Sequence, residues 1–290
     1  MRIDLHIHSK EGSDGRWSVE EIFKEAKKRD ISYISITDHD SIDAQCKAKE
    51  LSLRYNMGYI YGIELNITFS HPRYPEESPI SLDLLAYEYD LRDVSLNQAL
   101  NRLKDYRKKR ALEIIERLNY ELKKENRAPL TEDDIHNIES QVNGSFGRPH
   151  IANYLVKKGI VQDKEEAFQR YLHKCNVPKM PLSLEEASQL VRNAGGKVFF
   201  AHPSDPQGTS LIRFSNSIYD HIKIIEDSML PYLDGIECFH SRHEREISLI
   251  YLEFVKKKGL MFSGGSDCHQ DPVIMGTVEV PEEVIGFFNF

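Results

Sequence analysis

Short apolar runs alternate with amphipathic stretches over most of the chain. The pattern predicts strands where apolar and β-branched residues dominate, in RIDLHIHS (residues 2–9), YISITDHD (33–40), IYGIELNITF (60–69) and SLDLLAYEY (81–89). Between the first two strands, Ser18 and Glu21 form a capping-box pattern that predicts the start of a helix, and a second helix is expected over residues 41–55. This alternation is typical of a parallel α/β fold.

The alternation stops between residues 96 and 179, where the pattern predicts only helices. A long basic helix over Asn97–Glu125 precedes shorter helical segments in TEDDIHNIES, RPHIANYLVKKG and KEEAFQRYLHK. We therefore expect an all-helical insertion over residues 96–179, which covers the active site and divides a discontinuous domain formed by residues 1–95 and 180–290. The charge run DYRKKRALEIIERL fits a solvated helix face, with nucleic-acid contact as the alternative.

Strands and helices alternate again after Pro181. Helices over Leu184–Asn193, Ile218–Leu230 and Arg245–Lys258 precede the strands KVFFAHP, LDGIECFH and LMFSGGSDCH, respectively. These units bring the number of expected strands to about seven, each with polar residues at its C-terminal end. The arrangement predicts an α/β barrel of the TIM-barrel type, in which chemistry lies at the C-terminal face of the strands.

Composition excludes several classes of protein. The chain is 40% hydrophobic with a mean hydropathy of -0.50, and no apolar run reaches the roughly 18–20 residues of a membrane span. The N-terminus has no apolar signal core, and the four cysteines form no CxxC pair, so we expect reduced thiols in a cytoplasmic protein. A formal net charge of -8 argues against stable binding of duplex nucleic acid.

Histidines and carboxylates gather at the predicted strand ends. His6 and His8 are two residues apart on the first strand, so their side chains point to the same side. The remaining members of the set are Asp14 in the first loop, Asp38, His39 and Asp40 of TDHD, Glu64 of GIEL, His202 of FAHP, and Asp267 and His269 of GSDCH. Strand ends that merely reach water would also carry lysine, arginine and asparagine, so this near-exclusive set predicts a metal site.

The composition of the ligand set indicates which ions it would bind. Mixed histidine, aspartate and glutamate ligands suit Mn²⁺, Zn²⁺ or iron better than Ca²⁺ or Mg²⁺ alone, with Mg²⁺ kept as an alternative. The set exceeds what one tetrahedral ion needs, so two or three divalent ions are expected. Cys268 lies between two candidate ligands and is expected to face the opposite side of its strand and pack in the core.

The motifs DLHIHS, TDHD, GIEL, AHP and GSDCH, in this order and spacing, resemble the signature of the PHP (polymerase and histidinol phosphatase) family. The resemblance covers residues 1–90 and about 181–272, and it implies a distorted (β/α)7 barrel with a centre of two or three ions. Carried over position by position, it implies the metal ligands His6, His8, Asp14, His39, Glu64, His202, Asp267 and His269.

The chain departs from the family pattern at one position. The family usually has a histidine in the strand after the glutamate, where this chain has Asp83. Aspartate can ligate a metal, but its shorter reach and its negative charge leave the identity and occupancy of the third ion open. His71, in the preceding loop, is an alternative ligand.

The helical insertion carries a narrower resemblance. GRPHIANYL is similar to a motif of PHP phosphoesterases that act on nucleotides, including nucleoside 3',5'-bisphosphate phosphatases and 5'-to-3' exoribonucleases. The resemblance implies that Arg148 and His150 bind substrate phosphate, which agrees with the affinity of helix N-termini and arginine for phosphate. The alternative is a surface salt bridge for Arg148 and a helix cap for His150. ECFHSRHE adds His240 and His243, as metal ligands, substrate contacts or core residues.

We therefore expect a metal-dependent phosphoesterase that hydrolyses a phosphomonoester of a nucleotide or short oligonucleotide by in-line attack of a metal-activated water. Asp14 or Asp267 is expected to accept the proton of this water, and His202 or His243 to protonate the leaving oxygen. Asp38 and Asp40 are expected to orient the metal ligands.

Three alternatives remain at this stage. The protein could be a histidinol phosphatase-like or other small phosphomonoesterase, or an exonuclease that acts stepwise on short RNA. From a different class, it could be a metal-binding PHP domain that has lost catalysis, for which Asp83 is the one supporting feature. The sequence makes no prediction of oligomeric state.

Overall fold

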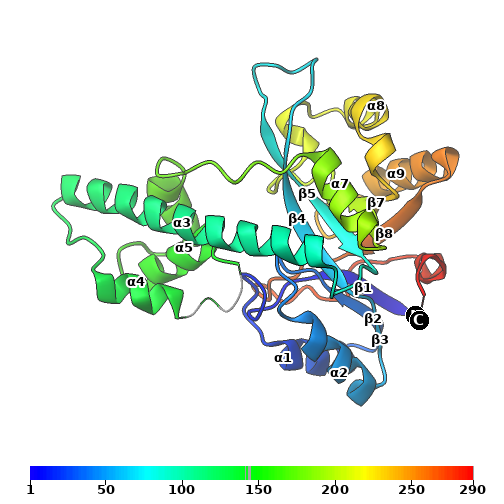
Figure 1. Cartoon of the computed structure of the whole chain (residues 1–290), viewed down its shortest axis with the longest axis horizontal. Helices are drawn as coiled ribbons and strands as arrows, with labels where there is room; N and C mark the ends of the chain where they lie inside the picture. Colours follow the sequence, from blue (N-terminus) through cyan, green and yellow to red (C-terminus); the bar gives the residue numbers. More distant parts are fainter. Residues whose placement is uncertain (141, 143–144, 290) are drawn as a thin grey trace.

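Two sheets and a separate helical unit make up the fold (Figure 1). The structure is a computed structural model that describes residues 1–140, 142 and 145–289. The sheets lie together in one part of the molecule, and the long helix α3 leads from them to the helical unit. No helix in these described ranges is both long enough and apolar enough to cross a membrane.

The smaller sheet contains three parallel strands in the order β1-β2-β3. Their bounds are β1 Arg2–Ile7, β2 Ile31–Ile36 and β3 Gly58–Tyr59, and the connecting helices are α1 Val19–Lys28 and α2 Gln45–Tyr55. The predicted capping box is present, because Ser18 and Glu21 exchange hydrogen bonds at the start of α1. Apolar side chains of both helices pack against β2 in one buried cluster.

The larger sheet contains five strands in the order β4-β5-β6-β7-β8. Its strands are β4 Gly62–Phe69, β5 Ile80–Tyr87, β6 Lys197–Phe200, β7 Gly235–His240 and β8 Met261–Gly265. The helices of this half are α7 Leu184–Asn193, α8 Ile218–Ser228 and α9 Arg245–Lys258, with short 3-10 turns η2 Leu211–Arg213, η3 Leu230–Tyr232 and η4 Glu282–Phe287. The predicted bounds of α7 and α9 are confirmed.

The expectation of an entirely parallel sheet is wrong at β5. This strand runs antiparallel to both β4 and β6, whereas β6, β7 and β8 are parallel to one another. The loop over residues 70–79 joins β4 and β5 as a hairpin, and it is too short for the crossover that parallel neighbours need. Asp83 lies in the middle of this strand. Glu64 lies near the beginning of β4 and not at the C-terminal strand end that we expected.

Isolated bridges join the two sheets at both edges. Ile7 bridges Cys268 just beyond β8, and His39 bridges Glu64, which links the end of β2 to β4. Strand pairing among the described residues thus gives two sheets in contact and eight strands, in place of the seven expected, so a closed (β/α)7 barrel is not shown. The second bridge joins two candidate metal ligands, and the first joins residues that lie next to candidate ligands, so the candidate metal centre lies at the junction of the sheets.

The helical unit has its own apolar core. It comprises α3 Val94–Lys124, α4 Glu132–Glu139, α5 Arg148–Lys157, α6 Lys164–Ala167 and the π-helical turn η1 Phe168–Leu172. The first turns of α3 bury Leu96 and Leu100 in the core of the sheets, whereas Ile114 and Leu118, further along, belong to the core of the helical unit. One continuous helix therefore fixes the direction of the unit relative to the sheets.

A buried carboxylate connects two helices of this unit. Asp134 forms a capping box with Thr131 at the start of α4, and it accepts hydrogen bonds from the Tyr154 hydroxyl at 2.7 Å and from the Lys158 ammonium at 2.6 Å. Burial alone would raise the pKa of Asp134, but these donors hold it well below its usual value.

Replacing this carboxylate should loosen the helical unit. We expect Asp134→Ala to lower the free energy of unfolding by about 2 kcal/mol at neutral pH, measured by urea denaturation followed by circular dichroism. Because the folded-state pKa lies below the unfolded one, this difference should shrink as the pH falls below the usual carboxyl value of about 4. The exposed neighbour Asp133→Ala is the control, and an equal loss in both variants would contradict the expectation.

Candidate metal centre

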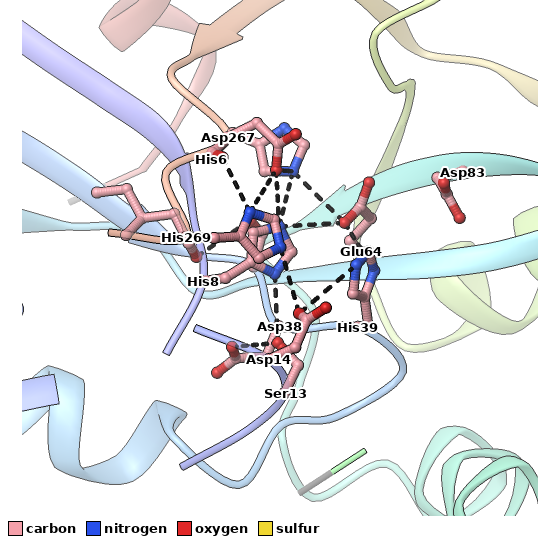
Figure 2. Close-up of polar contacts among 12 residues, drawn as sticks. His6, His8, Ser13, Asp14, Asp38, His39, Glu64, Asp83, Asp267 and His269 are labelled. Atoms are coloured by element: carbon pink, nitrogen blue, oxygen red, sulfur yellow. Dashed lines mark hydrogen bonds and ion pairs between the residues drawn. The ribbon is translucent and has the colours of Figure 1, made fainter. Parts of the chain in front are cut away.

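His6 lies in β1 and His8 directly follows it, and a neighbouring side chain contacts the Nδ1 atom of each imidazole. Both side chains are fully buried, and their Nε2 atoms lie 3.2 Å apart (Figure 2). The Nδ1 atom of His6 is 2.9 Å from Glu237 Oε1, and that of His8 is 3.3 Å from the Ser13 hydroxyl. These contacts leave both Nε2 atoms facing the same space, which is the arrangement that metal-binding histidines require.

Glu64 is the carboxylate on which the imidazoles converge. One oxygen, Oε1, is hydrogen-bonded to His202 Nε2 at 2.8 Å. The other, Oε2, lies 2.8 Å from His39 Nδ1, 3.3 Å from His8 Nε2 and 3.5 Å from His6 Nε2. Burial alone would raise the pKa of Glu64, but His39 and His6 hold it well below its usual value.

Asp14, Asp267 and His269 form the more accessible side of the centre. His269 Nε2 is 3.2 Å from Asp14 Oδ1, and His8 Nε2 is 3.1 Å from Asp267 Oδ1. The side chains of His269 and His39 are 31% and 25% exposed, in contrast to the buried His6 and His8. A substrate must therefore approach from the side of these partly exposed groups.

Two candidate ligands have strained backbone. His202 has φ 25° and Asp267 has φ 54°, a region that non-glycine residues seldom occupy. Both residues follow a strand by two positions, at the ends of β6 and β8. Such strain persists only where the surroundings impose it, and here it turns both side chains toward the centre.

The donor set fits divalent ions. Buried atoms without a hydrogen-bond partner include Asp14 Oδ1, Glu64 Oε2 and His202 Nδ1, although Glu64 Oε2 has three imidazole nitrogens nearby. Among the described residues, groups whose ligand atoms lie within 4.8 Å of one another are His8–Asp14–His39–His269, His6–His8–Asp267, His6–Glu64–His202, His39–Glu64–Asp83 and Asp205–His240–Asp267. Cations placed among these atoms would satisfy the orphaned atoms and balance the carboxylates.

Asp83 is less free than the other members of the set. Figure 2 shows it to one side of the imidazole cluster. Its Oδ1 accepts a hydrogen bond from Asn66 Nδ2 at 2.6 Å, and its Oδ2 accepts one from the Thr209 hydroxyl. His71, the alternative ligand, packs among Tyr74 and Phe214 and belongs to none of the ligand groups found in the described ranges. The structure thus favours Asp83 over His71 as a metal ligand. Both carboxylate oxygens of Asp83, however, already accept a hydrogen bond.

A second layer of carboxylates holds the ligands in place. Asp38 accepts hydrogen bonds from the backbone and hydroxyl of Ser9 and from the Ser13 hydroxyl, which in turn contacts His8. Asp40 accepts from the backbone of Asn66 at 2.9 Å and from the Arg107 guanidinium. The contacts of Asp38 agree with the orienting role expected for it, whereas the Asp40 side chain contacts Asn66 and Arg107 and, within the described ranges, no candidate ligand.

Sequence reasoning missed Glu237 and Asp205 and left His240 open. Glu237, fully buried in β7, contacts His6 Nδ1 with one oxygen and accepts the backbone N–H of His202 with the other at 2.7 Å. A glutamate inside the apolar strand LDGIECFH is the signal that could have identified it. Asp205 and His240 form a ligand group with Asp267. Asp205 follows His202 in a loop whose sequence has no distinguishing pattern.

The histidines expected to contact substrate are engaged elsewhere. His150 accepts the Gly147 N–H at Nδ1, and its Nε2 lies 3.2 Å from the Ser13 carbonyl, so it caps α5 and holds the loop of Asp14. His243 contacts Cys238 O through Nδ1 and accepts the Ser204 N–H at Nε2, and burial lowers its pKa to about 4. Neither ring has a free nitrogen, so phosphate binding by His150 and proton donation by His243 gain no support.

All four cysteines are unpaired, and Cys268 is fully buried beside the bridge to Ile7. Burial raises the pKa of its thiol. The packing role expected for Cys268 agrees with this position.

Known proteins share this fold over almost the whole chain. A Bifidobacterium adolescentis protein, provisionally described as a metal-dependent phosphoesterase, superposes with a TM-score of 0.79 over 98% of this chain and 94% of its own, at 26% identity. A 5'-3' exoribonuclease from Haemophilus influenzae is 26% identical over 92% of this chain and 90% of its own. A phosphoribosyl 1,2-cyclic phosphate 1,2-diphosphodiesterase from Eggerthella lenta is 24% identical over 92% of this chain and 93% of its own.

Fold, site and relatives together define a metal-dependent phosphoesterase, a hydrolase of phosphate esters. Residues 4–176 match the PHP domain, and the chain belongs to the PHP domain family. This match includes most of the helical unit, so it extends beyond the motifs at the strand ends.

Removing the carboxylate behind His6 should weaken metal binding. We expect Glu237→Gln to reduce affinity for Mn²⁺ or Zn²⁺ by about 10- to 100-fold, because the amide cannot hold the imidazole as the charged carboxylate does. Competition with a chromophoric chelator measures the change. Glu253→Gln, on the exposed face of α9, is the matched control, and equal affinities in the two variants would refute the role of Glu237.

Proposed function

We propose that this protein hydrolyses a phosphate ester of a nucleotide, either a nucleoside 3',5'-bisphosphate or a short 5'-phosphorylated oligonucleotide. The observation that carries this proposal is a set of four cations on and beside the helical unit, Arg107, Arg110, Arg148 and Lys179, which we call the basic cluster. The similarity to 5'-3' exoribonucleases supports the same class of substrate.

The basic cluster borders the metal centre through Asp40. Arg107, on α3, binds the Asp40 carboxylate with Nε and Nη2, and Asp40 directly follows the candidate ligand His39. Asp40, Asn66, Arg107, Arg110 and Lys179 line one cleft between α3 and the sheets. This cleft has a volume of only about 10 Å³, room for about one water molecule, so the basic cluster would attract an anionic part of a bound substrate by its charge and does not form a channel for it.

The cluster contains more positive charge than its surroundings balance. Arg110 is 5% exposed and donates only to neutral partners, Val177 O at 2.6 Å and Asn176 Oδ1 at 2.8 Å. Burial and the neighbouring arginines Arg148 and Arg107 lower its pKa to about 10. Cations withdrawn from water without a counter-ion are costly, so this region should favour an anionic ligand.

Lys179 and Arg148 are the least compensated members. No hydrogen bond or ion pair connects Lys179 to another residue in the described part of the chain, and burial lowers its pKa to about 8, although the nearby Asp83 opposes the shift. Arg148 begins α5, and its guanidinium lies 5.4 Å from the centre of the Phe168 ring. With respect to the described residues, both could donate to a phosphate, which is the role proposed for Arg148.

The charge distribution favours a substrate with two anionic groups. One phosphate would lie at the metal centre, and a second phosphate or phosphodiester would reach the basic cluster. Histidinol phosphate carries a cationic amine instead, which the basic cluster would repel. This repulsion favours the nucleotide over the alternative of a histidinol phosphatase.

His6, His8, Asp14, His39, Glu64, His202, Asp267 and His269 would hold the ions, with Asp83 or Asp205 and His240 at a third position. Bound divalent ions supply a water that is deprotonated near neutral pH and neutralise charge on the phosphate oxygens. Asp14 and Asp267, 14% and 12% exposed, can accept the proton of the attacking water. His202, with its unpartnered Nδ1, is a candidate to protonate the leaving oxygen only if it does not itself hold an ion.

Metal removal tests the chemistry. Dialysis against a chelator should abolish phosphate release from a nucleotide substrate, and Mn²⁺ should restore it, because the proposed nucleophile is a water that the bound ions activate. Phosphate release is the measurement, with metal content verified by mass spectrometry. Activity that persists in verified metal-free protein would contradict the mechanism.

Charge removal from the basic cluster tests the substrate class. Lys179→Gln should raise KM for a nucleoside 3',5'-bisphosphate by about tenfold or more, while hydrolysis of p-nitrophenyl phosphate changes little, because only the first substrate has a second anion. Lys157→Gln, exposed on α5, is the matched control.

A screen of nucleotides, bisphosphates, sugar phosphates and short 5'-phosphorylated oligomers should precede this comparison. Release of phosphate distinguishes a phosphatase, and release of mononucleotides an exonuclease. Equal KM effects on both substrates in Lys179→Gln, or a preference for sugar phosphates in the wild type, would count against the proposal.

A further inference from the structure

An arginine lies at the edge of the metal centre where a third cation would be expected. Asp205, His240 and Asp267 bring ligand atoms within 4.8 Å of one another. Next to this group, Nη1 of Arg242 is 2.6 Å from Asp205 Oδ2 and 4.0 Å from Asp267 Oδ2. The two carboxylates of the group therefore already have one fixed positive charge beside them.

Contacts at one guanidinium nitrogen, Nη1, and at its own backbone hold Arg242 in place. Asp205 is 1% exposed, and its other oxygen accepts the backbone N–H of Gln207 at 2.8 Å, so its own position is fixed. The backbone N–H of Arg242 donates to His240 Nδ1 at 3.3 Å, which fixes the start of the side chain immediately after β7. An arginine anchored at both ends in this way loses little further conformational freedom on binding a ligand.

The other guanidinium nitrogens of Arg242 remain able to donate to a ligand. Within the described ranges, Nε and Nη2 of Arg242 have no hydrogen-bond partner. The side chain is 38% exposed and lies beside Asp267, at the accessible side of the metal centre, whereas His6 and His8 on the far side are buried. The free donors thus border the space that a substrate phosphate must enter.

We propose that Arg242 binds a non-bridging oxygen of the scissile phosphate, as a built-in cation at the Asp205–Asp267 edge of the centre. A guanidinium can donate to the Asp205 carboxylate with one nitrogen and to a phosphate oxygen with another, because its donors form a planar fork. Arg242 would then supply beside Asp205 and Asp267 the positive charge that a third ion would otherwise supply. The role rests on hydrolysis of phosphate esters, and not on the nucleotide specificity proposed above.

Calorimetric titration of the metal-loaded protein with inorganic phosphate tests this role without turnover. Arg242→Gln should weaken phosphate binding by about 10- to 100-fold, since a charge-assisted hydrogen bond is lost. The phosphate affinity of Arg242→Lys should lie between those of Arg242→Gln and the wild type. The lysine ammonium keeps the charge, but it cannot donate to both Asp205 and phosphate as the planar guanidinium can. Metal content, measured by mass spectrometry, should be the same in all three proteins.

Arg245→Gln is the matched control, because Arg245 is exposed three residues further along and makes no ion pair with a described residue. Phosphate affinity in Arg242→Gln within about twofold of this control would overturn the proposal, as would a loss of bound metal from the variant. Failure of the nucleotide screen with a normal Arg242 effect on phosphate would overturn only the proposed substrate class.

Discussion

The rest of the structure depends on the contacts that the buried residue Glu64 makes with its backbone and its carboxylate. Its backbone N–H donates to Asp38 O, and its carbonyl accepts the N–H of Asp40, so the two sheets are joined at this residue. Its side chain meets imidazoles that come from β1, from the end of β2 and from the end of β6. The same residue therefore closes the fold and gathers the candidate ligands, which explains why the metal centre lies at the junction of the sheets.

Much of the metal centre could be predicted from local patterns. The spacing of His6 and His8 fixes the side of the strand on which both lie, and the motifs around His39, Asp267 and His269 each mark a strand end. Such signals depend on residues that are close in sequence, so they can be recognised without knowledge of the fold. The bounds of α7 and α9 were predictable for the same reason.

The features that could not be predicted depend on contacts between distant segments. The direction of β5 is different, because the predicted strands over residues 60–69 and 81–89 already leave a loop too short for a crossover, and this signal was missed. Glu237 acquires its role only because β7 passes behind His6, far away in the sequence. The capping of α5 by His150 could be weighed from the sequence, but its contact with Ser13 O could not.

The helical unit contacts the loop after β1, so the unit cannot be exchanged without affecting that loop. Ser145 N–H donates to Gly12 O at 2.7 Å, and His150 lies against Ser13 O, so the loop that presents Asp14 is held from the helical unit as well as from the sheets, where the Ser13 hydroxyl donates to Asp38. Exchanging the unit for one from another enzyme would also remove two contacts that position the candidate ligand Asp14. Evolution or engineering of new specificity on this scaffold must therefore preserve these two contacts while changing the residues around them.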